Sequence, residues 1–469
     1  MLIFALNASY AHQALGALTL AAHINSTSPG ACAVLECHIN ERDDELFYKL
    51  HQNAKGKKTV GFSCYIWNVE KMLKFARDLK KLLPDIYIIF GGPEVSYYDE
   101  AEFRRLYPFV DRLLTSVECE AWSVELYKNA DNYHTVYYES SKGCPFCCSY
   151  CISGITNEKV RAKDVETVLD ELKIIEEKYY NRENSKMNMI KFCDRSFNFD
   201  IKRANGIYRG LIERAGEYEK TYGKKLLPYQ FEIYPTLFDG DSFEILKTAP
   251  KGLFQLEIGI QSLNQKTLQA VGRKNFDTGR ALENIARIKS FGNIHVHADL
   301  IAGLPHEDLD SFMGGFDLLW EKTGADFIQI GFLKLLRGTR IREEAGLHGY
   351  IYEENPPYCV LANRYMGFEE LAFLRDAEKI YKRYFSGSYK KSLDYVLGGG
   401  GVFAILGALA KYWRENGLFE RPISQNDAFH AFYKTFEVSK NTDKNVLAGF
   451  LEKDFFAHEG KRLCILHNK

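Results

Sequence analysis

Residues 144–151, with the sequence CPFCCSYC, hold four of the eleven cysteines and are the part of the chain best suited to chemistry. Thiolates bind soft metals, and a single loop can wrap three of them around a compact iron–sulfur cluster. Cys144, Cys148 and Cys151 have the spacing CxxxCxxC, which leaves Cys147 outside the set. A structural zinc site is the alternative, because the segment also contains two abutting CxxC pairs. Zinc-binding pairs are normally separated by a longer loop, so we favour the cluster over zinc.

The elements that must position these thiols are predicted between residues 135 and 332. Short β-branched and apolar runs alternate there with helical patterns, notably at 165–180 and 279–290. The predicted strands are 136–140, 189–193, 230–234, 253–259, 295–300 and 327–332. This (β/α)6 pattern predicts a partial TIM barrel, whose active site lies at the carboxyl ends of the strands. The cysteine run directly follows the first of these strands.

The flanking segments are predicted to form two further domains, so the fold class is α/β with domains at 1–133, 134–340 and 341–469. The first domain shows the alternation of a doubly wound, Rossmann-like parallel sheet, with strands at 2–6, 31–35, 59–63 and 86–90 and helices at 11–24 and 68–83. Ligands of such a sheet bind beyond the carboxyl ends of its strands. The last domain is mostly helical by periodicity, with a helix break at 398–401.

The composition of the chain limits the classes of partner that we expect it to bind. With 61 basic and 62 acidic residues and no block of Lys or Arg, the chain lacks the charge expected of a protein that binds duplex nucleic acid. No apolar run reaches the roughly 18 residues that span a bilayer, and the first residues do not read as an export signal. We therefore expect a cytoplasmic protein with no membrane partner. Its cysteines then indicate metal binding or reactive thiols, because a reducing compartment does not keep a disulfide framework.

The CxxxCxxC spacing after a strand resembles the radical S-adenosylmethionine (SAM) superfamily. The resemblance implies that Cys144, Cys148 and Cys151 hold a [4Fe-4S] cluster whose open iron binds SAM. An electron, supplied by a donor of the flavodoxin or ferredoxin type, would cleave SAM to a 5'-deoxyadenosyl radical. That radical would abstract hydrogen from a small-molecule substrate.

Segments 256–262 and 299–305, with the sequences LEIGIQS and DLIAGLP, resemble the SAM-binding strands of the coproporphyrinogen dehydrogenase-like branch. The resemblance implies that Gln261 and Asp299 bind the ribose hydroxyls and that Arg273 pairs with the SAM carboxylate. It also implies contacts from Glu232, and adenine stacking by Tyr150. The residue types suit these roles, because hydroxyls need acceptors and a guanidinium binds a carboxylate in two-point fashion.

The whole chain resembles radical SAM proteins that carry an N-terminal cobalamin-binding fold and a C-terminal helical domain. The residues that carry this resemblance are 61–68, 90–94, 191–198 and 332–339. Two features depart from it, since there is no DxHxxG motif and residues 117–120 read Val-Glu-Cys-Glu where the family has Gly-Glu-Gly-Glu. Glycine there permits close backbone approach to the nucleotide tail, and a β-branched side chain would crowd it. Cobalamin binding thus stays open.

Within this neighbourhood the chain looks most like the group that salvages queuine, which converts it to 7-aminomethyl-7-deazaguanine. The leading expectation is therefore a radical SAM lyase acting on a small molecule such as a deazapurine base. The alternative enzyme is a cobalamin-dependent radical SAM methyltransferase. A non-catalytic iron–sulfur or cobalamin sensor is the third possibility, but it does not explain a complete set of SAM contacts.

Substrate contacts are expected from strand ends and from the helical domain. The catalytic candidates are Cys359, Asp194, Lys334 and His306, and further candidates are Tyr10, His12, Tyr65 and Tyr358. Cys359 follows Pro356, Pro357 and Tyr358 and could serve as a hydrogen donor or a substrate contact. The structural alternative for this thiol is a small buried apolar residue.

Overall fold

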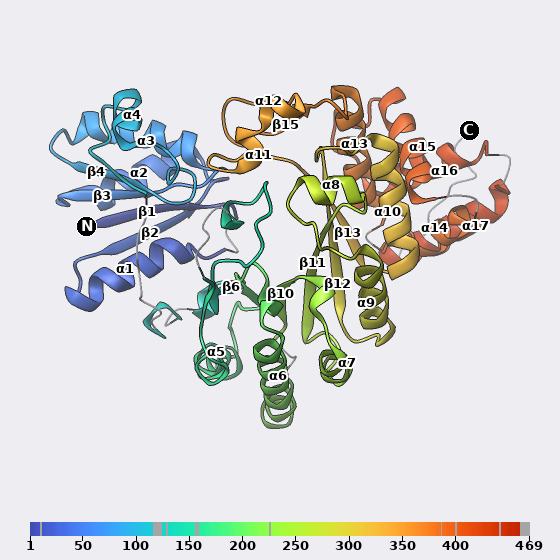
Figure 1. Ribbon diagram of the computed structural model, residues 1–469, viewed down its shortest axis with the longest axis horizontal. Helices are drawn as coiled ribbons and strands as arrows, with labels where there is room; N and C mark the ends of the chain where they lie inside the picture. Colours follow the sequence, from blue (N-terminus) through green and yellow to red (C-terminus); the bar gives the residue numbers. More distant parts are fainter. Residues whose placement is uncertain are drawn as a thin grey trace.

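The computed structural model describes residues 1–9, 12–115, 124–127, 130–154, 159–224, 227–385, 387–398, 401–439 and 442–459. Two parallel sheets and a group of helices follow one another along the long axis of the molecule (Figure 1). This arrangement confirms the predicted α/β class, with a doubly wound sheet first, a partial barrel next and helices last.

The N-terminal sheet has the strand order β2-β1-β3-β4-β5, and every pairing is parallel. Its strands are β1 (Leu2–Asn7), β2 (Ala33–His38), β3 (Thr59–Ser63), β4 (Tyr87–Gly91) and β5 (Arg112–Leu114). Its helices are α1 (Leu15–Thr27), α2 (Asp43–Ala54), α3 (Val69–Leu82) and α4 (Glu100–Leu106). The run LIFALN in β1 is apolar almost throughout because both faces of this central strand are covered.

The two faces of this sheet are covered unequally. One face carries the larger core, in which Phe4, Phe62 and Phe90 pack against α2, α3 and α4. The other face has a small core built from Ile3, Ala5 and residues of α1. The sheet can therefore hold a ligand on its second face, beside α1.

The prediction for this sheet misplaced both ends of the first helix, which is observed at Leu15–Thr27, and of the second strand, which is observed at Ala33–His38. It also omitted three elements. Helix α1 begins at Leu15 and not at residue 11, because Ala14 N donates to Glu36 Oε1 (2.6 Å) and Asn7 Nδ2 donates to His12 O (2.9 Å). These bonds hold residues 12–14 in the loop. The sequence-based prediction did not name α2, α4 or β5.

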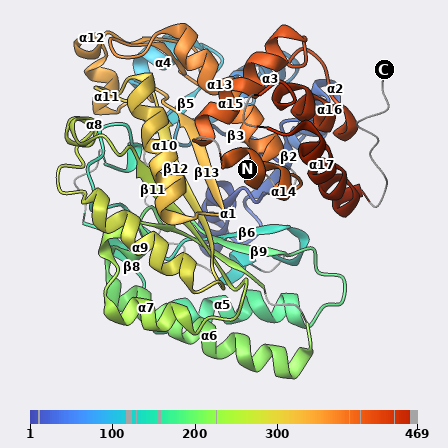
Figure 2. The same cartoon turned by 90° about the vertical axis from the view of Figure 1, so that its right-hand side faces the viewer.

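The second sheet has the order β13-β12-β11-β10-β9-β6 with all strands parallel, as expected for a (β/α)6 partial barrel. Its strands are β6 (Thr135–Tyr138), β9 (Met189–Phe192), β10 (Tyr229–Ile233), β11 (Phe254–Gln261), β12 (His295–Ala302) and β13 (Phe327–Phe332). The helices that accompany these strands are α5 (Val165–Tyr180), α6 (Ile201–Tyr222), α7 (Gly240–Lys247), α8 (Gln265–Ala270), α9 (Thr278–Ser290) and α10 (Leu309–Thr323). In Figure 2, α5, α6 and α7 lie on the outer side of this sheet.

The inner face of the barrel sheet is polar. Burial alternates along β11, where apolar side chains are buried and the intervening residues, among them Glu257 and Gln261, are only partly buried. Strand β12 shows the same alternation, with His297 and Asp299 on the partly buried side. The concave side of the barrel is thereby equipped to bind a polar ligand at the carboxyl ends of its strands.

The C-terminal part is helical and packs against the barrel at α10. It contains α11 (Arg340–Glu343), α12 (Ala345–His348), α13 (Phe368–Tyr384), α14 (Lys390–Leu397), α15 (Val402–Glu415), α16 (Gln425–Phe436) and α17 (Lys444–Glu459), with a two-stranded ribbon of β14 (Ile351–Tyr352) and β15 (Val360–Ala362). Phe316 of α10 packs edge-to-face on Tyr381 and Phe403. The predicted break lies between α14 and α15, which are bent by 111°.

Across the described part of the chain, no single helix has the length and apolarity to cross a bilayer. Only α14 and α15 taken together reach those limits, and they are sharply bent where they meet.

Candidate functional site

The cysteine loop lies at the carboxyl end of β6, beyond the short ribbon strand β7 (Ser141–Lys142), and its central residue is bound on both sides. Ser149 N donates to Val271 O (3.0 Å), and Ile341 N donates to Ser149 O (3.0 Å). Gly272 has φ +84°, and a Cβ there would lie 2.7 Å from Cys147 O. The loop is thus held between the end of α8 and the start of α11, with glycine required at the closest approach.

Cys144, Cys148 and Cys151 are partly exposed free thiols, and Cys147 is exposed. Cys144 Sγ lies 3.6 Å from Ser196 Oγ. Within the described residues, no three His, Cys, Asp or Glu side chains converge on a point that could hold one ion. A cluster does not require such convergence, because each thiolate binds a different iron atom. Three cysteine thiols on one loop are a donor set that suits an iron–sulfur cluster.

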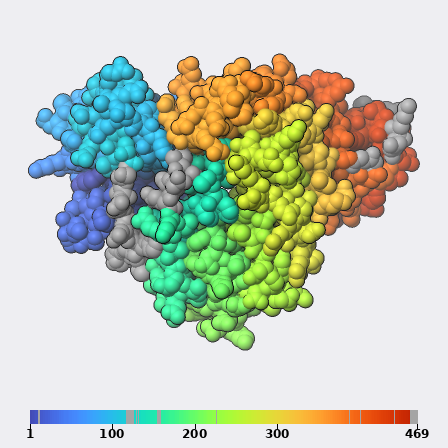
Figure 3. All heavy atoms as spheres, in the orientation of Figure 1, coloured from blue at the N-terminus to red at the C-terminus, as the bar shows by residue number. Residues whose placement is uncertain are grey.

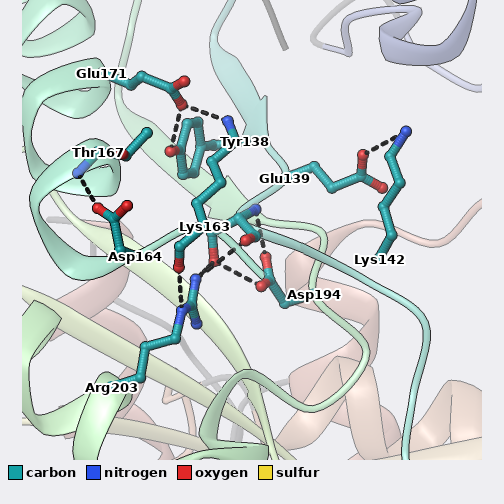
Figure 4. Close-up of polar contacts among 10 residues, drawn as sticks. Tyr138, Glu139, Lys142, Lys163, Asp164, Thr167, Glu171, Asp194 and Arg203 are labelled. Carbon is teal, nitrogen blue, oxygen red and sulfur yellow. Dashed lines mark hydrogen bonds and ion pairs between the residues drawn. The ribbon is translucent and has the colours of Figure 1, made fainter. Parts of the chain in front are cut away.

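Asp194 holds the start of this loop (Figure 4). Its carboxylate accepts from Ser140 N (3.0 Å), from Ser140 Oγ (2.6 Å) and from Ser141 Oγ. Arg203 supports the same turn by donating to Ser140 Oγ (2.7 Å) and to Lys163 O (2.7 Å). Asp194 is fully buried, and burial raises the pKa of its carboxyl. This geometry supports a positioning role for Asp194 and not the direct substrate contact that we expected.

Three of the expected SAM contacts meet around Gly259, near the end of β11. Arg273 Nη2 donates to Gly259 O (2.9 Å), and Asp299 is the register partner of Gly259 on β12. The pairing then slips at a bulge, and Gln261 adopts φ +73°. Bulges re-aim side chains at strand ends, and a non-glycine residue in this conformation is uncommon enough to suggest a functional constraint.

Arg273 has an unused donor in a buried position. Its guanidinium lies over the rings of Tyr234 (4.7 Å) and Phe276 (4.3 Å), and Phe146 of the cysteine loop stacks on Tyr234 at 3.8 Å. Arg273 is 6 % exposed, yet its Nε has no hydrogen-bond partner among the residues that the structure describes. A buried unpaired donor is costly, and a ligand carboxylate would satisfy it. The Tyr150 hydroxyl interacts with Arg273 and Cys148. This tyrosine therefore connects the cysteine loop to Arg273, one of the expected SAM contacts.

Carboxylates crowd the concave face beside these residues. Lys191 Nζ and Gln230 Nε2 both donate to Glu257 Oε2, at 2.9 Å and 2.6 Å. Burial, followed by the negative charges of Glu257 and Glu232, raises the pKa of Asp299 to about 7. Glu232 itself is partly buried, and burial raises the pKa of its carboxyl. Hydroxyl groups of a ribose are suitable partners for such acceptors.

Lys334 and Cys359 are brought together, whereas His306 lies elsewhere on the rim. Lys334 and Cys359 form an isolated antiparallel bridge just beyond β13. Burial and the Glu353 carboxylate raise the pKa of the Cys359 thiol. His306 is exposed, has φ +63° and contacts the ring of Tyr365 (4.6 Å). Catalytic roles for all three stay predictions.

Tyr358 links the C-terminal part to the N-terminal sheet. It is fully buried, its hydroxyl donates to Glu94 Oε1 (2.5 Å), and Arg337 Nε donates to the same hydroxyl (3.0 Å). Glu94 follows β4 and is itself 6 % exposed. In the space-filling view, the N-terminal surface (blue) adjoins the surface of the residues after β13 (orange) (Figure 3).

A cavity of about 750 Å³ lies on the second face of the N-terminal sheet and opens toward the barrel. Its floor is formed by Gly61, Ser63 and Gly91 of β3 and β4, and α1 forms one wall. Its mouth is lined by residues from both sheets, namely Asn7, His12, Tyr65, Trp67, Tyr137, Glu139, Lys142, Cys193 and Arg195.

Two of the expected substrate contacts lie at this mouth. Tyr65 stacks on Trp67 at 4.4 Å, and His12 meets Tyr137 edge-to-face at 5.6 Å. Tyr10 and residues 117–120 lie outside the described residues. Sequence reasoning did not single out Glu139 or Arg195. Arg195 follows the predicted strand 189–193, which was the available signal, whereas Glu139 lies inside the predicted strand 136–140 and follows β6 only because that strand ends at Tyr138.

The chain matches two family models. Residues 138–319 match the radical SAM superfamily, and residues 346–465 match a family described as a protein of unknown function, DUF4080. The radical SAM match covers β6 to α10, the part that carries the cysteine loop and the residues around Gly259.

Among curated proteins, the chain is similar to the cobalamin-dependent radical SAM methyltransferase TokK of Streptomyces tokunonensis. The two are 23% identical over 341 residues, which is 59% of this chain and 47% of TokK. It is also 24% identical over 353 residues to the 2-(S-pantetheinyl)-carbapenam-3-carboxylate methyltransferase of Streptantibioticus cattleyicolor, covering 62% of this chain and 49% of that protein. The chain spans about half the length of the curated relatives it matches.

Among solved structures, the chain resembles the cobalamin-dependent SAM radical enzyme OxsB with a TM-score of 0.59 at 12% identity, covering 98% of this chain and 79% of OxsB. It also resembles the radical SAM methyltransferase TsrM of Kitasatospora setae, with a TM-score of 0.56 at 14% identity, covering 76% of this chain and 78% of TsrM. These similarities extend the match in fold beyond the barrel to the N-terminal sheet.

Proposed function

Since residues 138–319 form a radical SAM domain, we propose that this chain is a corrinoid-dependent radical SAM enzyme that methylates a small-molecule substrate. This proposal reverses the order of our sequence-based expectations, because the similar proteins with known activities include cobalamin-dependent methyltransferases and give no support to a queuine lyase. We also propose that the domain boundaries are 1–133, 134–340 and 341–469.

The cavity beside α1 is the single observation that carries the proposal. Its volume of about 750 Å³ lies within the range of cofactor sites, and it runs from the N-terminal sheet to the mouth of the barrel. A corrinoid has a broad ring and a long nucleotide tail, so it needs a large cavity. Gly61 and Gly91, which have no side chains, are among the residues that line this one. The residues present therefore fit a corrinoid with its tail beside α1.

The chain's own residues would bind and orient the reactants. Cys144, Cys148 and Cys151 would hold the cluster, and Arg273 would use its unpaired Nε for the SAM carboxylate. Gln261 and Asp299 would accept from the ribose hydroxyls. The bound groups would supply radical formation and methyl transfer, as cofactors do in enzymes of this kind.

The substrate would lie between the cavity mouth and the residues around Gly259. Glu139, Cys193 and Arg195 line the mouth on the barrel side and would contact it. Burial raises the pKa of the Glu139 carboxyl, and Lys142 Nζ lies 3.6 Å from it. A deazapurine base and a donor of the flavodoxin or ferredoxin type stay part of the proposal as candidate substrate and partner.

The products of SAM distinguish methyl transfer from lyase chemistry. Protein reconstituted anaerobically with iron, sulfide and cobalamin would be incubated with SAM and a reductant, and nucleosides would be separated by chromatography. We expect S-adenosylhomocysteine, which is what remains after SAM gives up its methyl group, only when cobalamin is present. Formation of 5'-deoxyadenosine alone, together with conversion of added queuine to 7-aminomethyl-7-deazaguanine, would establish the lyase and refute the methyltransferase.

Serine variants supply the matched control for the cluster. Cys144→Ser, Cys148→Ser and Cys151→Ser should each lose the brown absorbance and most of the bound iron. Cys147→Ser should keep both, because this exposed thiol lies outside the triad. Equal iron loss in all four variants would favour a four-thiolate zinc-type site.

A further inference from the structure

Two residues at the carboxyl ends of neighbouring barrel strands adopt a left-handed backbone conformation although neither is glycine. Gln261 ends β11 and has φ +73°, and His306 follows β12 and has φ +63°. This conformation is uncommon for residues with a side chain and persists only where surrounding contacts hold it. The next residue in each case, Ser262 and Glu307, makes such a contact.

Ser262 and Glu307 bind each other in the interior of the protein. Ser262 Oγ donates to Glu307 Oε1 (2.5 Å), and the same hydroxyl accepts from Asn264 N (2.9 Å). The two residues are only 1 % and 2 % exposed. Burial raises the pKa of the Glu307 carboxyl to about 7. Because this bond is shielded from water, it ties the two left-handed turns firmly together.

Asn264 extends the connection to the helices that follow both strands. Its Nδ2 donates to His306 O (3.2 Å) and to Ser311 Oγ (3.0 Å), in the first turn of α10. Its Oδ1 accepts from Lys266 N (3.0 Å) and thereby caps α8. The far end of α8 is the end that contacts the cysteine loop. The two turns are therefore part of the same framework that holds this loop.

The side chain of Gln261 folds back over the strand that it ends. A Cβ at Gly259 would lie 2.4 Å from Gln261 Nε2, so the amide occupies the space that a side chain at Gly259 would need. Arg273 Nη2 donates to the carbonyl of the same glycine. The Gln261 amide and the Arg273 guanidinium, two of the expected SAM contacts, thus meet at one residue. The position of this amide depends on the left-handed turn beside Ser262.

We infer that Ser262 and Glu307 are positioning residues, whose bond fixes the turn at Gln261 and thereby aims the Gln261 amide at the ribose of SAM. The inference rests on the part of the proposed function in which Gln261 binds the ribose hydroxyls, and it is independent of the substrate. Neither residue has to touch SAM, because the bond acts through the backbone of Gln261. Without it, the turn can relax to a more common conformation that points the amide elsewhere.

The experiment measures SAM binding to the full-length chain by anaerobic calorimetry, after the cluster has been reconstituted and without a reductant. We expect Ser262→Ala and Glu307→Ala to bind SAM about 10-fold more weakly than the parent, the effect of one lost hydrogen bond, with unchanged iron content. A 2',3'-dideoxy analogue of SAM lacks the ribose hydroxyls and should bind the parent and both variants equally well.

The outcomes separate the inference from the proposed function. Unchanged SAM affinity in both variants, or an equal loss for SAM and its analogue, would overturn the inference and leave the proposed function standing. A parent protein that binds no SAM would overturn both. If Glu307→Ala does not fold, Ser262→Ala carries the test, because it removes a single oxygen atom.

Two further variants distinguish positioning from a general loss of stability. Glu307→Gln should restore the SAM affinity, because its amide oxygen can accept from Ser262 and its shape matches that of a neutral carboxyl. Asp454→Ala removes a similar buried pair in the helical domain, where Ser392 Oγ donates to Asp454 Oδ2 (2.7 Å). It should lower the unfolding temperature and leave SAM affinity unchanged. Equal weakening of SAM binding in Asp454→Ala, or no rescue by Glu307→Gln, would refute the positioning role.

Discussion

Asp299 lies on the concave face of the barrel, close to other carboxylates. Burial and the nearby charges of Glu257 and Glu232 raise its pKa to about 7, and Lys191 offsets them only in part. In the unfolded chain this carboxyl titrates near its ordinary value of 3.8. Between those two pH values the folded protein holds a proton that the unfolded chain has lost, so stability falls as the pH rises through this window.

Asp299→Asn should remove this pH dependence. The variant should match the parent near pH 4 and become more stable than the parent above pH 7, by on the order of 2–4 kcal/mol in the free energy of unfolding. Urea unfolding of the SAM-free protein across this pH range measures the difference. Asp394→Asn, the same substitution at an exposed position, is the matched control. A stability difference that is the same at every pH would contradict the assignment.

At the scale of elements, one buried side-chain contact joins the segment 353–360 to the loop after β4. Tyr358 bridges Glu94 and Arg337, and the Glu94 carboxylate also lies near the positive charges of Arg337 and Arg342. Burial raises the pKa of Glu94, as expected for a carboxyl that relies on few hydrogen bonds. This contact joins the loop after β4 to the segment that carries Cys359.

Tyr358→Phe should cost about 1–3 kcal/mol in the free energy of unfolding, because it leaves a buried carboxylate without its donor. In the background of Glu94→Gln the same change should cost less, since an amide is cheaper to leave unpaired than a charge. Hydrogen exchange over residues 353–360 and urea unfolding report the two effects, and Tyr48→Phe on the exposed surface serves as the control. Identical losses in both backgrounds would show that the two side chains are not coupled.

The elements themselves were largely predictable, whereas the contacts between them were not. The barrel strands follow from local periodicity, and the cysteine loop follows from spacing alone. The start of α1 was misplaced because Glu36, 22 residues away, binds Ala14 N. The pair Glu94 and Tyr358 is separated by 264 residues, so no local pattern could indicate it. Gln261 was found by resemblance, but its left-handed backbone and the bulge beside it appear only when β11 is paired with β12.

For the whole molecule, the loop after β4 touches all three parts of the chain. Gly92 and Ser96 line the cavity, Glu94 binds Tyr358, and the ring of Tyr97 packs against Gly338. Burial and the nearby Cys151 thiol raise the pKa of Tyr97, which places this ring beside the cysteine loop. Ligand binding in the cavity should therefore also stabilise the parts of the chain outside the N-terminal sheet against unfolding.

Cobalamin should raise the thermal unfolding temperature of the full-length chain. At a free concentration 100-fold above its dissociation constant, a ligand that binds only the folded state adds about 2.7 kcal/mol. Differential scanning fluorimetry with increasing cobalamin measures the rise, and Gly61→Val should show it only at higher concentration. An unfolding temperature that stays constant at saturating cobalamin would contradict the corrinoid assignment.

The attachment of Ser149 to Val271 and Ile341 has a consequence for how the protein matures. Both bonds are made by the polypeptide alone, so the cysteine loop is held in place before any iron arrives. A backbone that is already restrained at Ser149 has less conformational entropy to lose when the metal is delivered, and preorganisation of this kind favours capture. Iron and sulfide can thus be inserted late, into a chain that has already folded.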